Sequence, residues 1–189
     1  MSRRCSVARY LPGGFLNMLR KYRDQAPQVA PSAYVDPAAN VIGEVTIGAR
    51  SSVWPATTLR GDIAPITVGE ETNIQEASVV HTDVGFPAVI GNRVSVGHGA
   101  VIHGCIIEDD CLIGIGSIVL TGARVGRGSV VAAGALVPEG MQVPADTVVM
   151  GMPAKPRRSV SDEERARFRA GIAGYVRRAQ EYGEQANHD

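Results

Sequence analysis

The chain has 189 residues, which favours one domain, or one domain with a terminal appendage, over two full domains. Its 19 basic and 19 acidic residues balance, so no overall positive charge is available to bind nucleic acid or an anionic membrane surface. The hydrophobic residues, 44% of the chain, are dispersed, and no run approaches the roughly 18 apolar residues of a membrane-spanning helix. Cys5, Cys105 and Cys111 show no CxxC spacing, so we expect reduced thiols and a soluble cytoplasmic protein without a targeting peptide.

The first predicted segment, residues 1–28, is irregular and locally basic. A segment of this kind in front of a repeat most often forms a loose arm or covers the open end of the first repeat unit. We therefore predict an N-terminal arm or cap, which contains Arg3, Arg4, Arg9, Arg20, Lys21 and Arg23.

Residues 29–157 contain a six-residue repeat of valine, isoleucine or leucine. Glycine often follows the aliphatic residue, and the residue four positions later is mostly small. A six-residue period fits neither a 3.6-residue helix nor strand alternation over this length, but it fits short strands separated by tight corners. The aliphatic positions are Val35, Val41, Ile47, Val53, Leu59, Val68, Ile74, Val80, Ile90, Val96, Ile102, Ile107, Ile113, Val119, Val125, Val131 and Val137.

Three of these repeats make one 18-residue coil of a triangular prism. The aliphatic residue points into the narrow interior, the small residue fits near a corner, and successive coils pair their backbones at roughly 4.8 Å. Seventeen repeats give just under six coils. We therefore predict an all-β solenoid, a parallel β-helix, rather than a sandwich of short strands.

The six-residue period is interrupted at three places. Three extra residues lie between Leu59 and Val68, four lie between Val80 and Ile90, and one residue is missing after Ile102. We expect the two insertions to be loops, where binding and catalytic residues concentrate.

The last predicted segment, residues 158–189, is a helix that packs on the outside of the prism. Two prolines in GMPAKP end the repeat, and Ser161 with Glu164 forms the pattern of a capping box. Apolar side chains then recur at helical spacing, which predicts a packing stripe formed by Phe168, Ile172, Val176, Ala179 and Tyr182.

Counting repeats rather than residues places polar side chains on the edges of the prism. Leu59, Val80 and Ile102 are three repeats apart, so the residues that follow them stack on one edge in successive coils. That edge holds Arg60, His81 and His103. The same count places Gln75, Glu76 and His98 on another edge, on the order of 15 Å away.

These three histidines predict a metal site shared between subunits. The imidazoles of His81 and His103, one coil apart, can both reach an ion at ~2.1 Å. His98 cannot meet them within its own chain, but a neighbouring subunit related by three-fold symmetry could present it. We therefore expect a homotrimer with one metal site per subunit interface and an open position for water. Ordinary outward-facing or hydrogen-bonded histidines are the alternative.

Several motifs occur in order over about residues 29–157. They are Leu59-Arg60-Gly61-Asp62, Pro65-Ile66, Asn73-Ile74-Gln75, Val80-His81-Thr82, Gly97-His98, His103-Gly104-Cys105, Val137-Pro138-Glu139-Gly140 and Gly151-Met152-Pro153-Ala154-Lys155. In these motifs the chain resembles the γ-class carbonic anhydrase-like family of the hexapeptide-repeat superfamily.

The resemblance implies a left-handed β-helix and a metal ion, Zn²⁺, Fe²⁺ or Co²⁺, held across trimer interfaces by His81, His98 and His103. It also implies that Gln75 contacts the metal-bound water or the substrate. Arg60 and Asp62 resemble the family's interfacial charged pair, which orders the site between subunits.

Two features depart from the family pattern. Glu76 stands where the family usually has aspartate, and its extra methylene is expected to displace any carboxylate partner of Arg60 or the water. The loop after His81 carries only Asp83, whereas the best-known branch has a longer acidic loop with a glutamate proton shuttle, so weak turnover is expected.

Tyr175 resembles a family tyrosine that reaches toward the site from the C-terminal helix; simple packing is the alternative.

The function implied by the resemblance is the reversible hydration of carbon dioxide to bicarbonate. A metal with three histidine ligands lowers the pKa of bound water to roughly 7 and gives hydroxide that attacks carbon dioxide. One alternative is a hexapeptide-repeat acyltransferase or thioester-processing enzyme, whose chemistry needs no transition metal. The other is a non-catalytic protein that binds a metal or siderophore or serves as a scaffold. The candidate catalytic residues are Gln75, Arg60, Asp62, Glu76 and Tyr175.

Overall fold

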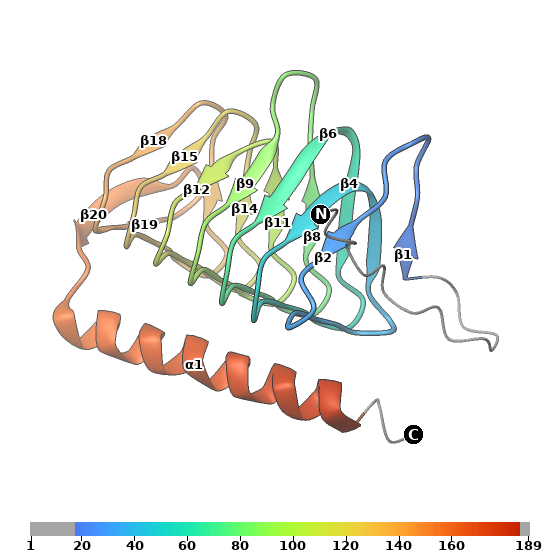
Figure 1. Ribbon diagram of the computed structural model, residues 1–189. Helices are drawn as coiled ribbons and strands as arrows, with labels where there is room; N and C mark the ends of the chain where they lie inside the picture. Colours follow the sequence, from blue (N-terminus) through green and yellow to red (C-terminus); the bar gives the residue numbers. More distant parts are fainter. Residues whose placement is uncertain (1–17, 186–189) are drawn as a thin grey trace, which may run out of the picture.

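The computed structural model describes residues 18–185, which form a left-handed parallel β-helix of about seven turns followed by a single helix (Figure 1). The predicted fold class is confirmed. The predicted number of coils, just under six, is too small because pairing continues at both ends of the repeat. At the start Leu19 pairs with Val41, and at the end Val143 and Val149 add further inward positions.

A twelve-stranded sheet covers two faces of the prism, because two of its strands run through the corner between those faces. Its strands are β1 (Leu19–Arg20), β2 (Gln28–Val29), β4 (Asn40–Ile47), β6 (Thr58–Val68), β8 (Val79–His81), β9 (Ala88–Ile90), β11 (Val101–His103), β12 (Ile106–Ile107), β14 (Ile118–Val119), β15 (Arg124–Val125), β17 (Leu136–Val137) and β18 (Gln142–Val143).

An eight-stranded sheet forms the third face. Its strands are β3 (Tyr34–Val35), β5 (Ser52–Val53), β7 (Asn73–Ile74), β10 (Ser95–Val96), β13 (Leu112–Ile113), β16 (Val130–Val131), β19 (Thr147–Met150) and β20 (Lys155–Ser159). β20 pairs antiparallel with β19 and leads the chain out of the solenoid toward the helix. The predicted boundary between residues 157 and 158 falls inside β20. The predicted arm over residues 1–28 contains β1, while its first 17 residues lie outside the described part of the chain.

The interior of the prism consists of the repeated aliphatic side chains, most of which are fully buried. Several of the small residues four positions later are serine or threonine, and most of their hydroxyls donate to backbone carbonyls of the next coil. Ser51 Oγ lies 2.6 Å from the carbonyl oxygen of Gly69, and Thr57 Oγ1 lies 2.8 Å from that of Gln75. These bonds satisfy hydroxyls that would otherwise be buried without partners.

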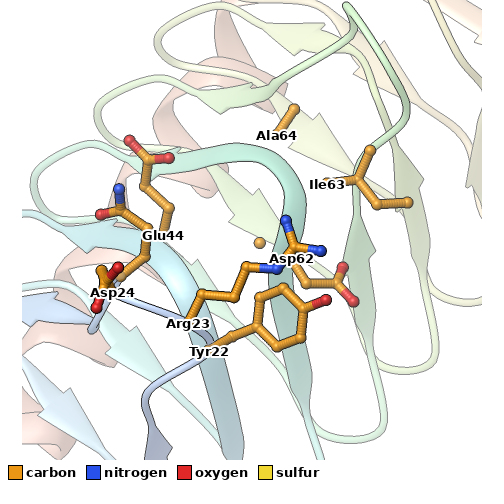
Figure 2. Close-up of a pocket in the computed structure, with 9 residues that line it drawn as sticks. Tyr22, Arg23, Asp24, Glu44, Asp62, Ile63 and Ala64 are labelled. Carbon is orange, nitrogen blue, oxygen red and sulfur yellow. The ribbon is translucent and has the colours of Figure 1, made fainter.

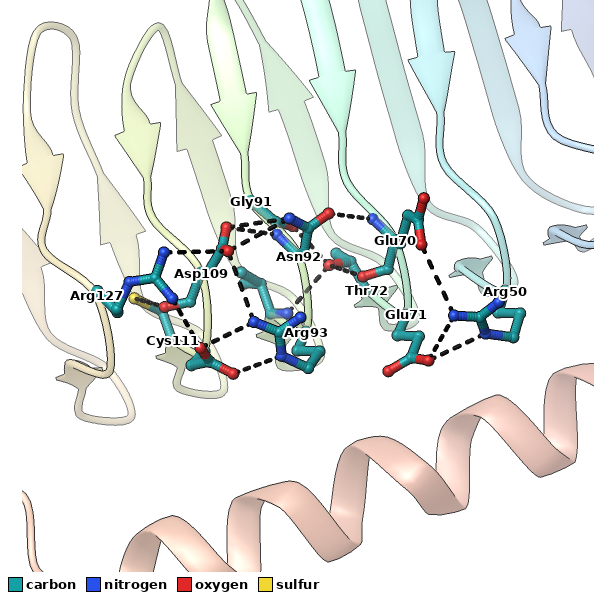
Figure 3. Close-up of polar contacts among 12 residues, drawn as sticks. Arg50, Glu70, Glu71, Thr72, Gly91, Asn92, Arg93, Asp109, Cys111 and Arg127 are labelled. Carbon is teal, nitrogen blue, oxygen red and sulfur yellow. Dashed lines mark hydrogen bonds and ion pairs between the residues drawn. The ribbon is translucent and has the colours of Figure 1, made fainter.

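One corner of the prism carries a ladder of charged side chains whose signs alternate from coil to coil (Figure 3). Arg50, Glu71, Arg93 and Asp110 occupy successive coils, and all four have a positive φ of 53° to 61°. Arg50 donates two hydrogen bonds to Glu71, and Arg93 donates two to Asp110, at 2.7 to 3.0 Å. A left-handed conformation costs roughly 1–2 kcal/mol for a residue with a side chain, and the paired charges offset part of this cost.

The two insertions differ from each other in structure. The prediction of a loop between Leu59 and Val68 is wrong, because β6 is one continuous strand that takes up the extra residues as an irregularity at the corner. Thr82 in the next coil fixes this corner, since its Oγ1 lies 3.1 Å from both the backbone nitrogen and the carbonyl oxygen of Ala64. The insertion before Ile90 is a tight turn, closed by two backbone hydrogen bonds between Asp83 and Phe86.

Helix α1 (Asp162–Gln185) runs along the outside of the eight-stranded sheet and contacts β3, β5 and β7 (Figure 1). The predicted capping box is confirmed: the Ser161 nitrogen donates to the Glu164 carboxylate, and the Glu164 nitrogen donates to Ser161 Oγ. Ile172 and Ala179 of the predicted stripe are buried. No helix within residues 18–185 combines the length and apolar character that crossing a membrane requires.

Candidate metal and catalytic site

Strands β6, β8 and β11 place three polar side chains on one edge of the prism. Arg60 pairs in register with His81, and His81 pairs in register with His103. The preceding residue in each strand is fully buried in the interior, so strand alternation turns the next side chain outward. The stacking expected from the repeat count is observed in the structure.

The two stacked histidines face each other through ring nitrogens. His81 Nδ1 lies 3.2 Å from His103 Nε2, and the ring centroids are 5.2 Å apart. Two nitrogens bound to one tetrahedral ion at about 2.0–2.1 Å are separated by about 3.3 Å. The pair therefore has the spacing of two ligands of a single ion. Within residues 18–185 of one chain, no group of three or more histidine, cysteine or carboxylate side chains could hold a metal.

The other ring nitrogens of these histidines have hydrogen-bonding partners. His81 Nε2 lies 3.2 Å from Asp62 Oδ1, and His103 Nδ1 lies 2.9 Å from Thr121 Oγ1. Asp62 also accepts a hydrogen bond of 2.6 Å from Arg60. Partial burial would raise the pKa of Asp62, but the bonds from Arg60 and His81 outweigh it and lower that pKa. Asp62 is therefore an ionised partner that fixes the orientation of His81.

His98 stands on a different edge, one coil from Glu76. Ile74 pairs with Val96, which brings the residues two positions later to the same level. His98 Nδ1 lies 2.6 Å from Glu76 Oε2, and among the described residues no hydrogen bond joins His98 to His81 or His103. His98 follows β10 of the eight-stranded sheet, whereas His81 and His103 end β8 and β11 of the twelve-stranded sheet, so the edge that carries Glu76 and His98 is distinct from the edge with the other two histidines.

Gln75 is buried, and both hydrogens of its amide have acceptors in its own chain. Gln75 Nε2 lies 2.9 Å from Asn73 Oδ1 and 3.2 Å from Ser95 Oγ. Gln75 is expected to contact the metal-bound water or the substrate, and with both amide hydrogens bonded, its carbonyl oxygen is the group left for that contact. Asn73, which belongs to the same motif as Gln75 but had no predicted role, accepts one of these bonds. Its Nδ2 is buried and has no hydrogen-bond partner among the described residues.

Tyr175, a residue of helix α1, packs on the face of the prism that leads to the edge with Glu76. Its ring meets Trp54 edge to face at 5.5 Å, and the Arg178 guanidinium lies 4.7 Å from its ring centroid. Burial raises the pKa of Tyr175, and the nearby charge of Glu76 raises it further. The helix therefore brings Tyr175 close to Glu76, and the same ring also packs on the sheet.

A hollow of about 290 Å³ opens beside Asp62 (Figure 2). The N-terminal turn that contains Tyr22 and Arg23 forms one wall, and the corner of β4 and β6 with Glu44 and Ile63 forms the other. Sequence reasoning missed this turn because its residues belong to no repeat. The hollow places solvent-accessible space next to the carboxylate that contacts His81.

The turn that follows His81 exposes apolar side chains. Val84 is 78% exposed and Phe86 is 45% exposed, while Asp83 uses one carboxylate oxygen to accept the Val84 N–H at 2.7 Å. A Cβ atom on Gly104 or Gly122 would come within 3.2 Å of Phe86, so these glycines make room for its side chain. As the sequence suggests, this turn contains no glutamate.

The family model for bacterial transferase hexapeptides (six repeats) matches residues 104–139. The chain is 41% identical over 165 residues to a carbonic anhydrase of Geobacillus kaustophilus, with 87% of this chain and 91% of the relative covered. It is also 41% identical over 163 residues to γ carbonic anhydrase 2, mitochondrial, of Arabidopsis thaliana; there the match covers 83% of this chain but only 59% of the plant protein.

Among solved structures, a hexapeptide transferase family protein from Anaplasma phagocytophilum is 37% identical, with a TM-score of 0.84 and coverage of 87% of this chain and 97% of that one. The name of this relative refers to transfer chemistry, whereas the two relatives above are named carbonic anhydrases. The Geobacillus relative, 41% identical and covered to 91% of its length, is named a carbonic anhydrase, and the plant relative's name gives the γ class. The chain belongs to the γ-class carbonic anhydrase-like family of hexapeptide-repeat proteins.

Proposed function

We propose that this protein catalyses the reversible hydration of carbon dioxide to bicarbonate at metal sites between the subunits of a homotrimer. The observation that carries the proposal is the 3.2 Å approach of His81 Nδ1 and His103 Nε2 on one edge. A third histidine, His98, stands on another edge, with its Nδ1 directed at Glu76. One subunit supplies two ligands, and its neighbour supplies the third.

The residues present fit a bound transition metal. Neutral imidazole is a common ligand of Zn²⁺, Fe²⁺ and Co²⁺, and the nitrogen spacing of His81 and His103 suits a single ion. When bound by three histidines with an open position, such a metal lowers the pKa of water to about 7 and so supplies a nucleophile for carbon dioxide at neutral pH. His81 and His103 of one subunit and His98 of the next would hold the ion.

The surrounding side chains hold these ligands and face the substrate. Asp62 and Thr121 fix the imidazole orientations of His81 and His103, and Arg60 holds the second oxygen of Asp62. Gln75 offers its carbonyl oxygen as an acceptor, which can orient the hydrogen of a nucleophilic water. Carbon dioxide is small and uncharged, so its binding needs no charged side chain of its own.

The proposal is tested by measuring metal content and hydration rate on the same preparation. Anaerobically purified protein should contain Zn²⁺, Fe²⁺ or Co²⁺ at about one ion per chain, and stopped-flow measurements should show hydration that chelation removes. Protein without metal and without hydration in the zinc, cobalt and iron forms would refute the proposal. A tight metal site without measurable hydration would favour a scaffold or binding role.

A second candidate function is acyl transfer. The short contact between His98 and Glu76 resembles the pairing of a general base with its orienting carboxylate, and a hexapeptide transferase family protein shares the fold. The protein would then transfer an acyl group from a thioester to a hydroxyl or amine. Transfer from acetyl-coenzyme A by metal-free protein, with no hydration by the metal-loaded form, would establish this function instead.

We also place the protein in the cytoplasm. Cys105 and Cys111 are free thiols in the core, and burial raises the pKa of each to about 12. Buried thiols of this kind need no oxidising compartment and are protected from reaction.

A further inference from the structure

We propose that Glu76 is the positioning residue of His98, directing Nε2 of that imidazole toward the neighbouring subunit's pair of histidines. The inference rests on the proposed shared metal site and adds to it a residue that governs the third ligand. Glu76 Oε2 lies 2.6 Å from His98 Nδ1, the distance of a strong charge-assisted hydrogen bond. An Nδ1–H donated to Glu76 leaves the lone pair on Nε2, the nitrogen that can bind a metal.

The backbone fixes the positions of both Glu76 and His98. Ile74 and Val96 are in register, so Glu76 and His98 stand at the same level of two adjacent coils. The carbonyl of Glu76 accepts the Gly99 N–H at 2.9 Å, which ties the two corners together. The carboxylate therefore approaches His98 from a fixed base.

Exposure explains why His98 depends on this contact more than His81 depends on any single partner. The His81 side chain is only 14% exposed and has contacts to both Asp62 and His103, whereas the His98 side chain is 47% exposed. An exposed imidazole on a corner samples several rotamers in the absence of a partner. The hydrogen bond to Glu76 restricts that freedom before the subunits meet, which lowers the entropy cost of forming the site.

The length of the glutamate side chain matters for the same reason. An aspartate is shorter by one C–C bond, about 1.5 Å, and from the same backbone position its carboxylate would fall short of Nδ1. Within the described chain Arg60 donates to Asp62, and Glu76 contacts His98.

Helix α1 runs beside β7, the strand that ends two residues before Glu76. Tyr175, fixed against Trp54, lies near enough for the charge of Glu76 to influence its pKa. The C-terminal helix thus borders the group that holds the third ligand.

The test compares Glu76→Ala and Glu76→Gln with Glu181→Ala, a control that removes an exposed carboxylate elsewhere on α1. Metal affinity is measured by competition with a chromophoric chelator. The His98 tautomer is read in metal-free protein at pH 8 by ¹⁵N NMR. Glu76→Ala should weaken metal binding by about 10- to 100-fold and mix the two tautomers. Glu76→Gln, whose amide oxygen still accepts Nδ1–H, should keep the tautomer and most of the affinity, and Glu181→Ala should match the parent protein.

Parent-like affinity together with a parent-like His98 tautomer in Glu76→Ala would overturn the inference. The two proposals fail in different ways. A parent protein that binds no metal refutes the proposed function, whereas the tautomer in metal-free protein still decides whether Glu76 orients His98. If the parent binds metal, and neither the metal affinity nor the His98 tautomer changes in the Glu76 variants, only the positioning role is refuted.

Discussion

Mixed trimers of two inactive variants give a direct test of the shared site. His98→Ala removes the ligand on one edge, and His103→Ala removes a ligand on the other, so a trimer made of either variant alone has only incomplete sites. If each site combines His98 of one subunit with His81 and His103 of the next, some interfaces in a mixed trimer contain three intact histidines. Metal should therefore return when the two variants are assembled together.

The expected recovery follows from the arrangement of the edges. His81 and His103 are paired in register on one edge, and His98 has no hydrogen bond to either of them within the described chain. A His103→Ala protomer still has His98, and a His98→Ala protomer still has His81 and His103. With random 1:1 assembly, an interface is complete when the first kind of protomer supplies His98 and the second kind supplies the other two histidines. This occurs at about a quarter of the interfaces of a three-fold symmetric assembly.

The matched control mixes the parent with the double variant His98→Ala/His103→Ala, which carries the same number of alanines overall. Shared sites predict about a quarter intact in this control as well, whereas a site within one chain predicts about half in the control and none in the mixed single variants. Differently tagged protomers are co-refolded, native mass spectrometry verifies that mixed trimers form, and metal content is measured over the whole population of trimers. Absence of metal from the mixed single variants, with about half the sites filled in the control, would refute the shared site.

Three further predictions concern stability and proton transfer. Gly114→Ala should destabilise the fold by about 3 kcal/mol or more, because its Cβ would lie 2.7 Å from the Val131 carbonyl oxygen in the next coil; Gly116→Ala, which has free space but φ +64°, should cost only about 1–2 kcal/mol. Equal urea midpoints for the two variants would contradict this reasoning. The pKa values of Glu108 and Asp109 are lower in the folded than in the unfolded protein. The Arg127 N–H is the chief cause for Glu108, and for Asp109 the effect of burial is outweighed by hydrogen bonds from Asn92. The stability that these two carboxylates contribute is therefore fully present above the unfolded pKa of about 4 and is lost as pH falls through the folded pKa values. Urea unfolding from pH 7 to pH 3 should show a free energy of unfolding that depends less on pH in Glu108→Gln/Asp109→Asn than in the parent. An unchanged pH dependence would count against this reasoning. Finally, hydration should be slow in dilute buffer and rise with imidazole concentration, because the turn after His81 exposes apolar side chains and contains no glutamate to export the proton; a flat response with high activity would show that another residue carries it.

The sequence alone was sufficient to predict the solenoid and the edges of its prism. An inward aliphatic residue every six positions is a local requirement that each coil repeats, so a count along the chain also predicts which residues stack. His81 over His103 and the separate edge with His98 follow from that count. Val143 and Val149 continue the same period and could have been counted, whereas the pairing of Leu19 with Val41 spans 22 residues and has no repeat to reveal it.

The tertiary structure decided how the polar side chains are paired at the corners. Glu76 contacts His98 rather than Arg60, Gln75 uses its donors on Asn73 and Ser95, and β6 absorbs an insertion that looked like a loop. These outcomes depend on shifts of an ångström or less in the positions of the side chains. Those positions are set by the φ angles at the corners and by the irregular strand register. A hydrogen bond forms or fails over that distance, whereas the burial of an aliphatic side chain tolerates it. The repeat therefore determines the fold and the edges, and the geometry of the corners determines the chemistry displayed on them.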